Sequence, residues 1–205
     1  MLTTTIGGLV NRSRVAASVI LLLCASVSVG QAQEPSAADL KAVRDGLEQY
    51  QDPMAAVRDG YLSTVACIAF PQGASEGTMA YVPGGMGVHF INMSLVGPTL
   101  DPTKPQVLIY EPVGEELRLV AAEWFMPAQL VGDTKPSILG HELQGPMEGH
   151  EPLMPASLHH LDLHVWLWMD NPAGMFSPTN PNLTCPAGAP YTFNEKATKM
   201  VHDEH

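Results

Sequence analysis

Residues 106–125 read QVLIYEPVGEELRLVAAEWF, and this stretch decides the fold class. Two apolar runs, 106–111 and 117–125, flank a short connection containing Pro and Gly, which is the pattern of a β-hairpin. Similar apolar runs of strand length, separated by Gly, Pro, Asp and Asn, occur at residues 62–70, 78–82 and 86–93. The sequence therefore predicts an antiparallel sheet.

Two short helices are predicted before the first strand. Ser36 can cap the first helix, in which apolar residues recur at helical spacing as far as Leu47. Pro53 fits the first turn of the second helix, and Gly60 can end it in the left-handed conformation. We expect an α+β fold in which these helices pack on an antiparallel, loop-rich sheet that could be barrel-like.

The predicted domain organisation has four parts. Residues 1–32 form a signal peptide, 33–60 a helical segment, 61–190 an antiparallel β domain and 191–205 a flexible tail. Within the β domain, residues 126–157 are rich in Pro and Gly and have little periodicity, which predicts a long functional loop.

The amino terminus has the pattern of a cleaved secretory signal. Arg12 and Arg14 precede an apolar run at residues 15–29, and small residues follow at the expected cleavage site. The alternative, a membrane anchor, is less favoured because a span needs about 20 apolar residues. We expect an exported protein, periplasmic or extracellular, with no membrane span after cleavage.

The charge of the chain argues against nucleic acid as a partner. The whole chain has 10 Lys and Arg against 21 Asp and Glu, for a net charge of −11. Cleavage after residue 32 would remove two Arg and no acid, leaving −13. Such a protein repels a phosphate backbone at long range.

Two cysteines, Cys67 and Cys185, remain after the predicted cleavage. In an oxidising compartment such a pair most simply forms one disulfide, and two free thiols are the alternative.

Histidines provide the most informative chemistry. The segment HHLDLHVWLW, residues 159–168, is favoured as a strand because the run ends at Asn171 and Pro172 and would be apolar nearly all round as a helix. In a strand, Asp162 and His164 share one face with His160, Trp166 and Trp168, and the first two could reach one ion. In a helix, His160 and His164 would instead be the pair able to share a metal.

Three further residues are candidates for a site. His89 follows a glycine-rich segment, GGMG, that lets backbone or ligand approach closely, although a core histidine bonded to a carbonyl is equally consistent. Glu111 and Glu123 lie within apolar runs, where a carboxylate needs a cation or several donors to stay ionised. They lie about 20 Å apart along the predicted hairpin, so at most one belongs to a single site.

Several motifs carry a resemblance to a known group of proteins. They are GGMGVHFIN, LIYEP, AAEWF, GHEPLMP and HHLDLHVWLWMDNPAGMFSPTNP, together with Cys185. With these motifs the chain resembles an uncharacterised family of secreted bacterial proteins. The resemblance implies a bacterial origin and recurring histidines at His89 and His164, and it implies no activity or cofactor.

The leading hypothesis is a divalent transition-metal site. His89 and His164 would bind zinc, copper, nickel or iron, with Asp162 or Glu111 completing the ligand set. Whether the ion would be catalytic, structural or cargo stays open, and no catalytic residue is predicted because the chain has no Gly-x-Ser-x-Gly, HExxH or phosphate-loop motif.

Two alternatives stay open. One is a metal-free module that binds a small molecule between Trp166, Trp168, Tyr110 and the histidines. The other is a structural or interaction domain whose histidines are satisfied internally. The sequence predicts neither the substrate nor the oligomeric state.

Overall fold

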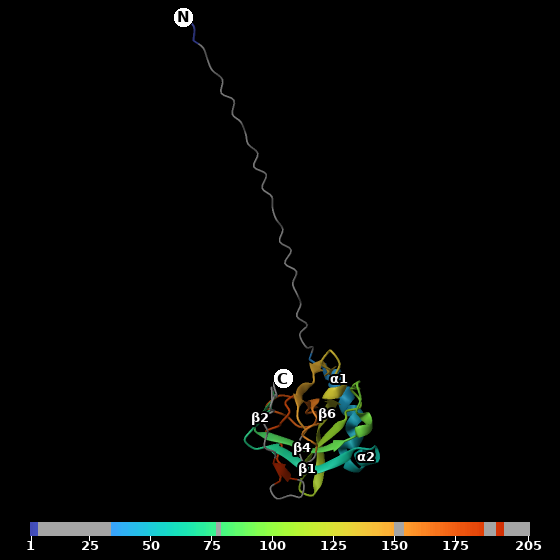
Figure 1. Cartoon of the computed structure of the whole chain (residues 1–205). Coiled ribbons are helices and arrows are strands. Elements are labelled where there is room, and N and C mark those ends of the chain that lie inside the picture. Colours follow the sequence, from blue (N-terminus) through green and yellow to red (C-terminus); the bar gives the residue numbers. More distant parts are fainter. Residues whose placement is uncertain (4–33, 77–78, 150–153, 187–191, 195–205) are drawn as a thin grey trace. The chain divides into compact units, whose positions relative to one another are not determined.

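The computed structural model describes residues 1–3, 34–76, 79–149, 154–186 and 192–194 (Figure 1). All the helices and strands below belong to the unit Ala32–His205. The predicted signal peptide lies almost wholly outside the described residues, and export stays a prediction. Within the described residues, no helix is both long enough and apolar enough to span a membrane.

The two amino-terminal helices form where the sequence predicts them. Helix α1 covers Ala37–Leu47, the 3₁₀ helix η1 covers Glu48–Gln51, and α2 covers Pro53–Arg58. The Ser36 hydroxyl accepts from the backbone N–H of Asp39, whose side chain accepts in return, so a full capping box begins α1. Gly60 follows α2 with φ of 94°, as expected for a left-handed stop.

Seven strands make one sheet in the order β11-β1-β4-β5-β6-β10-β9. Their bounds are Leu62–Phe70 for β1, Gly84–Ile91 for β4, Val107–Val113 for β5, Glu116–Pro127 for β6, Gln144–Met147 for β9, His160–Val165 for β10 and Thr192–Asn194 for β11. Neighbouring strands are antiparallel except β1 and β11, which are parallel. The mixed α+β class is confirmed, and so is the strand at β10.

The suggestion of a barrel is wrong. The two end strands of the sheet, β9 and β11, each pair with one neighbour only in the part of the chain that the structure describes. A closed barrel needs every strand to pair on both sides. The sheet is therefore open.

Two predicted segments contain more structure than expected. Residues 126–157 were expected as one long loop, yet they hold η3, Ala128–Leu130, and the strands β7, Ser137–Ile138, β8, His141–Glu142, and β9. Residues 192–194 were expected in a flexible tail but form β11 beside β1. Strands this short give no periodicity that a sequence pattern can reveal. Two remaining short strands, β2 at Ala74–Glu76 and β3 at Met79–Tyr81, pair with each other, and η2 covers Met93–Leu95.

The two faces of the sheet have different partners. Figure 1 shows α1 and α2 together on one side of the domain. Tyr110 of β5 faces η1, where its hydroxyl donates to the carbonyl of Tyr50 at 2.7 Å. Trp124, Leu161 and other apolar residues join the same core, and the residues that alternate with them point to the opposite face. That opposite face carries the buried histidines.

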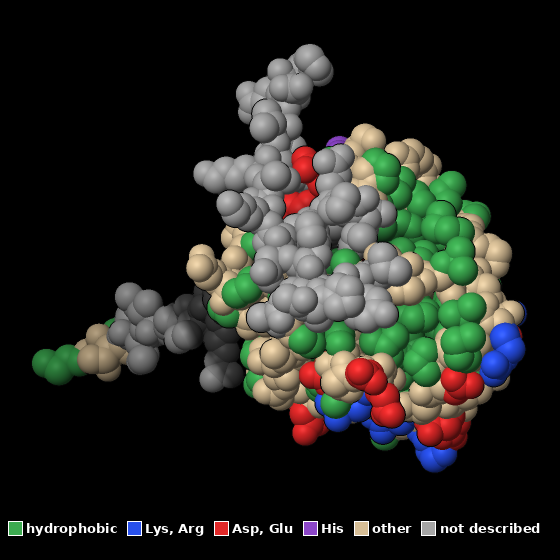
Figure 2. Space-filling view, turned by 90° about the horizontal axis from the view of Figure 1, so that it is seen from below, with side chains coloured by type: hydrophobic (Ala, Val, Ile, Leu, Met, Phe, Trp, Pro, Cys, Tyr) green, Lys and Arg blue, Asp and Glu red, His purple; other side chains and the backbone are tan. Residues whose placement is uncertain are grey.

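Some hydrophobic side chains stay exposed. Met54 of α2, Leu62 of β1 and Met93 of η2 are each more than half exposed. Figure 2 shows one face of the molecule on which hydrophobic side chains gather, with acidic and basic side chains along its lower margin.

Glycines of β4 allow a second chain segment to lie against the strand. Gly85 exchanges two backbone hydrogen bonds with Asn180, at 2.9 and 3.0 Å. A Cβ at Gly84 would come within 2.6 Å of the Asn180 backbone. The glycine-rich segment before His89 therefore serves the close approach of backbone.

Gly87 is the glycine of β4 that we expect to tolerate substitution least. Its φ is +84°, and a Cβ there would come within 2.7 Å of the Tyr110 carbonyl oxygen. We expect Gly87→Ala to lower the free energy of unfolding by about 2 kcal/mol or more, because left-handed strain and a backbone clash add. Urea denaturation measures this. Gly97→Ala is the control, since a Cβ there meets nothing within 4 Å; equal stability of the two variants would contradict the explanation.

The disulfide predicted between Cys67 and Cys185 is present, with Cα atoms 5.6 Å apart. It joins β1 to the segment that follows the Gly85–Asn180 contact. The closed loop spans 118 residues of sequence separation. A disulfide that closes a loop of this size lowers the conformational entropy of the unfolded chain substantially.

Replacing both cysteines, Cys67→Ala with Cys185→Ala, should destabilise the fold by up to about 5 kcal/mol. Urea denaturation of the oxidised wild type and the double variant gives the difference. Reduced wild type should match the double variant to within about 1 kcal/mol, since both lack the cross-link. A wild type that unfolds at the same urea concentration with and without reductant would contradict the prediction.

Candidate metal centre

Three buried residues from three different strands converge on the face opposite the helices. His89 comes from β4, Glu123 from β6 and His164 from β10. One ligand atom of each lies within 4.8 Å of the other two. The rings of His89 and His164 are centred 6.0 Å apart, so the two histidines do reach one site.

Strand register explains the convergence. Glu123 of β6 is directly paired with His164 of β10 on one side and with Val107 of β5 on the other. Directly opposed residues point to the same face with Cβ atoms about 5 Å apart. Val107 is in turn paired with Ile91, two residues along β4 from His89. The side chains of Glu123 and His89 therefore point to the same face and meet across β5.

The distances suit ligands arranged around a small cation. Glu123 Oε2 lies 3.4 Å from His89 Nε2 and 3.6 Å from His164 Nε2. These values are beyond good hydrogen-bond length, yet close to the donor separation of about 3.3 Å that tetrahedral coordination with bonds near 2.0 Å requires. Among the described residues, neither ring nitrogen of His164 has a hydrogen-bond partner. A buried polar atom of this kind needs a partner, and a metal ion fits.

Asp162 lies behind the cluster. Its Oδ1 is 3.6 Å from His164 Nδ1, the ring nitrogen that does not face Glu123, and its Oδ2 is 3.7 Å from His160 Nε2. A carboxylate on the far nitrogen of a metal-binding histidine fixes the tautomer and orients the ring. Asp162 is thus placed to orient His164, and the three ligand atoms that cluster belong to His89, Glu123 and His164.

The charges in this site are mutually dependent. Burial acts to lower the pKa of His164, but attraction by Glu123 and Asp162 outweighs it and raises that pKa above the ordinary value. Burial likewise acts to raise the pKa of Asp162, but His164 and His160 hold it below the ordinary value. In the metal-free protein, the charged forms of Asp162 and His164 therefore stabilise each other.

The other residues of the predicted site lie elsewhere. Glu111, predicted as a possible ligand, forms an ion pair with Arg118 across the β5–β6 hairpin. The two residues are also directly opposed in the strand register. The carboxylate that joins the histidines is Glu123, which sequence analysis identified as a buried acid but did not place in the ligand set. The position of Glu123 within an apolar run indicated a buried acid. The strand register that brings Glu123 rather than Glu111 to the histidines cannot be predicted from the sequence.

The three predicted aromatic residues do not form a pocket with the histidines. Tyr110 lies in the core beneath the helices, and Trp166 donates from Nε1 to the Ser177 carbonyl at 2.7 Å. Strand β10 ends at Val165, so Trp166 and Trp168 no longer follow its alternation. They line a separate surface groove together with Arg44.

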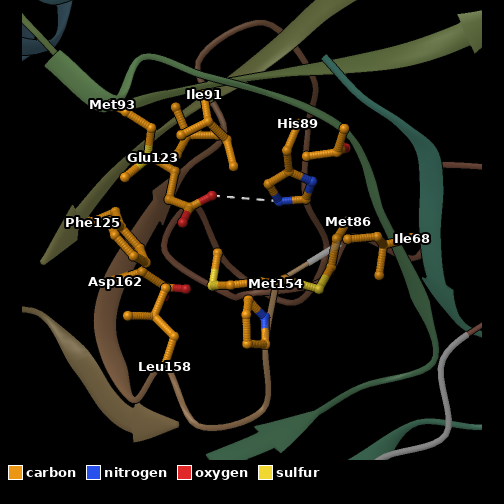
Figure 3. A pocket seen from close by; sticks show the side chains of 13 residues that line it. Ile68, Met86, His89, Ile91, Met93, Glu123, Phe125, Met154, Leu158 and Asp162 are labelled. Carbon is orange, nitrogen blue, oxygen red and sulfur yellow. Dashed lines mark ion pairs between the residues drawn. The ribbon is translucent and has the colours of Figure 1, made fainter. Parts of the chain in front are cut away.

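A cavity of about 240 Å³ adjoins the cluster, and His89, Glu123 and Asp162 form part of its wall. Figure 3 shows His89 and Glu123 facing each other across it, with Asp162 on the same side as Glu123. In the part of the chain that the structure describes, no Lys or Arg lines the cavity. Two carboxylates, those of Glu123 and Asp162, thus border the space.

Comparisons of the chain with protein-family models, with curated proteins and with solved structures found no match. The resemblance to an uncharacterised secreted family therefore stays a prediction, and function has to be argued from the site.

The geometry predicts how Asp162 affects His164. In metal-free protein, Asp162→Asn should lower the pKa of His164, because the substitution removes one of the two charges that raise it. Imidazole resonances followed by NMR over a pH titration report this pKa. Asp45→Asn, an exposed substitution on α1, is the control and should leave it unchanged. A His164 pKa that is the same in all three proteins would contradict the arrangement described.

Proposed function

We propose that the protein binds one divalent transition-metal ion through His89 Nε2, Glu123 Oε2 and His164 Nε2. The observation that carries the proposal is the buried trio with ligand atoms within 4.8 Å of one another. Two imidazoles and one carboxylate are a ligand set found with zinc and with ferrous iron. Asp162 positions His164 from the far ring nitrogen.

Three protein ligands leave a further coordination position. Structural zinc sites are usually closed by four protein ligands, whereas sites that act on other molecules keep a position open. Because the cavity adjoins the trio, that position would face enclosed space. A bound ion would supply a Lewis acid there, and the chain's own residues would exclude bulk water and hold the ion in place.

We also propose that the protein works outside the cytoplasm. A disulfide persists in oxidising compartments, and Cys67 and Cys185 form one. The composition of residues 1–32 supports the same location.

Zinc titration of purified metal-free protein by calorimetry tests the metal site. We expect one ion per chain, and His89→Ala, His164→Ala and Glu123→Gln should each weaken binding at least 100-fold, since each removes one of three ligands. Asp162→Asn should weaken it by 10- to 100-fold, as loss of an outer partner does. Circular dichroism checks that every variant keeps its fold.

The matched control is Glu111→Gln, the same change at a carboxylate on the neighbouring strand β5. It should leave zinc affinity within about threefold of wild type, because Glu111 pairs with Arg118. His202→Ala with His205→Ala controls for binding by histidines near the carboxyl terminus. Zinc binding that survives Glu123→Gln and His164→Ala, or that disappears with the last two histidines, would overturn the proposal.

A further inference from the structure

The cavity beside the metal centre points to the class of molecule that binds there. We infer that it takes a small aromatic molecule whose oxygen-donor group occupies the open position on the ion, while its ring lies among apolar side chains. The inference rests on the proposed metal function and deepens it.

The lining of the cavity is almost entirely apolar. Thr64, His89, Glu123 and Asp162 are the polar residues among the thirteen that line it. The others are aliphatic, aromatic or thioether side chains such as Ile68, Ile91, Val107, Phe125 and Leu158. Three of these four polar residues, His89, Glu123 and Asp162, belong to the trio or lie beside it, so a ligand would present a donor there and hydrophobic surface elsewhere.

The size of the cavity limits the ligand. A dry cavity of about 150 Å³ is enough to bind benzene in an engineered protein, whereas sites for drug-sized ligands begin near 300 Å³. The volume here is about 240 Å³, between these two. A single ring with a short polar arm fits, and a peptide or an oligosaccharide does not.

Charge and polarity exclude other small ligands. Among the described residues, no Lys or Arg lines the cavity to pair with a phosphate or a polycarboxylate. Glu123 and Asp162 already balance the two charges of a divalent ion, so a neutral or singly charged donor is favoured. A sugar would bury hydroxyls against apolar walls without partners, which is costly.

Three thioethers favour an aromatic ring over an aliphatic chain. Met86, Met93 and Met154 all line the cavity, and Figure 3 shows Met86 and Met154 extending into it from one side and Met93 on the other. Methionine sulfur makes favourable contacts with aromatic rings and adapts its shape to them. Met93 is also 64% exposed, so the ligand would enter beside η2.

Cobalt-loaded full-length protein tests the inference, because Co²⁺ has visible absorption that reports its ligands. The probes are benzohydroxamate and acetohydroxamate, which share a metal-binding group and differ in the ring. We expect both to alter the cobalt spectrum, with benzohydroxamate binding on the order of 100-fold more tightly, since each buried carbon strengthens binding several-fold. Metal-free protein should bind benzohydroxamate at least 100-fold more weakly, as measured by calorimetry.

A cavity-filling variant locates the ring. Ile91→Phe places a larger side chain in the cavity wall and should reduce the preference for benzohydroxamate to less than fivefold, with the cobalt spectrum before ligand addition unchanged. Val113→Phe, which adds even more volume but at a half-exposed residue of the hairpin, should keep the preference. If Ile91→Phe fails to fold, the relative affinity of the two hydroxamates for wild-type protein still tests whether the cavity prefers an aromatic ring.

The outcomes separate this inference from the proposed function. A protein that takes up no Co²⁺, or that takes it up equally well in Glu123→Gln, refutes the metal site itself. A protein with a cobalt spectrum that depends on Glu123 but with equal affinity for the two hydroxamates keeps the metal site and refutes the aromatic ligand. A cobalt spectrum unaffected by either probe also refutes the inference, because the open position would then be inaccessible.

Discussion

Two carboxylates buried on one face of a sheet are the constraint on which this structure depends. Glu123 and Asp162 are each less than 5% exposed. A buried carboxylate is costly unless cationic or polar groups compensate for lost hydration. Here the compensation comes from His89, His160 and His164, which alternate with the two acids along a continuous row of contacts between 3.4 and 3.7 Å. A metal ion bound in this row would neutralise both charges at once.

The rest of the sheet makes that arrangement possible. The helices occupy the opposite face, where Tyr110 and Trp124 complete an apolar core, so the site face is left free of helix packing. Glycines of β4 let residues near Asn180 approach the strand, and the disulfide holds the chain shortly beyond that contact. His89 therefore lies on a strand supported from β1, from β5 and from the later segment.

Much of the fold was predictable because its signals are local. Capping by Ser36, the stop at Gly60 and the hairpin between β5 and β6 all depend on residues within a few positions of each other. Short strands such as β7, β8 and β11 were missed, since two or three residues show no periodicity. The site was predicted in part: alternation placed Asp162 and His164 on one face, but the choice between Glu111 and Glu123 required the register of three strands. That register follows from turn geometry, a β-bulge beyond Ile109 and packing, which no single segment encodes.

The origin of the three ligands has a consequence for how the protein would acquire an ion. The three ligands lie on three strands, with His89 on β4, Glu123 on β6 and His164 on β10. In the sheet, β5 separates β4 from β6, and β10 follows β6 only after a long stretch of chain, so no two adjacent strands hold all three ligands. A partly folded chain lacks the full set, so assembly of the sheet must precede tight coordination. The compartment in which the sheet assembles, rather than the one in which the polypeptide is made, would then supply the ion.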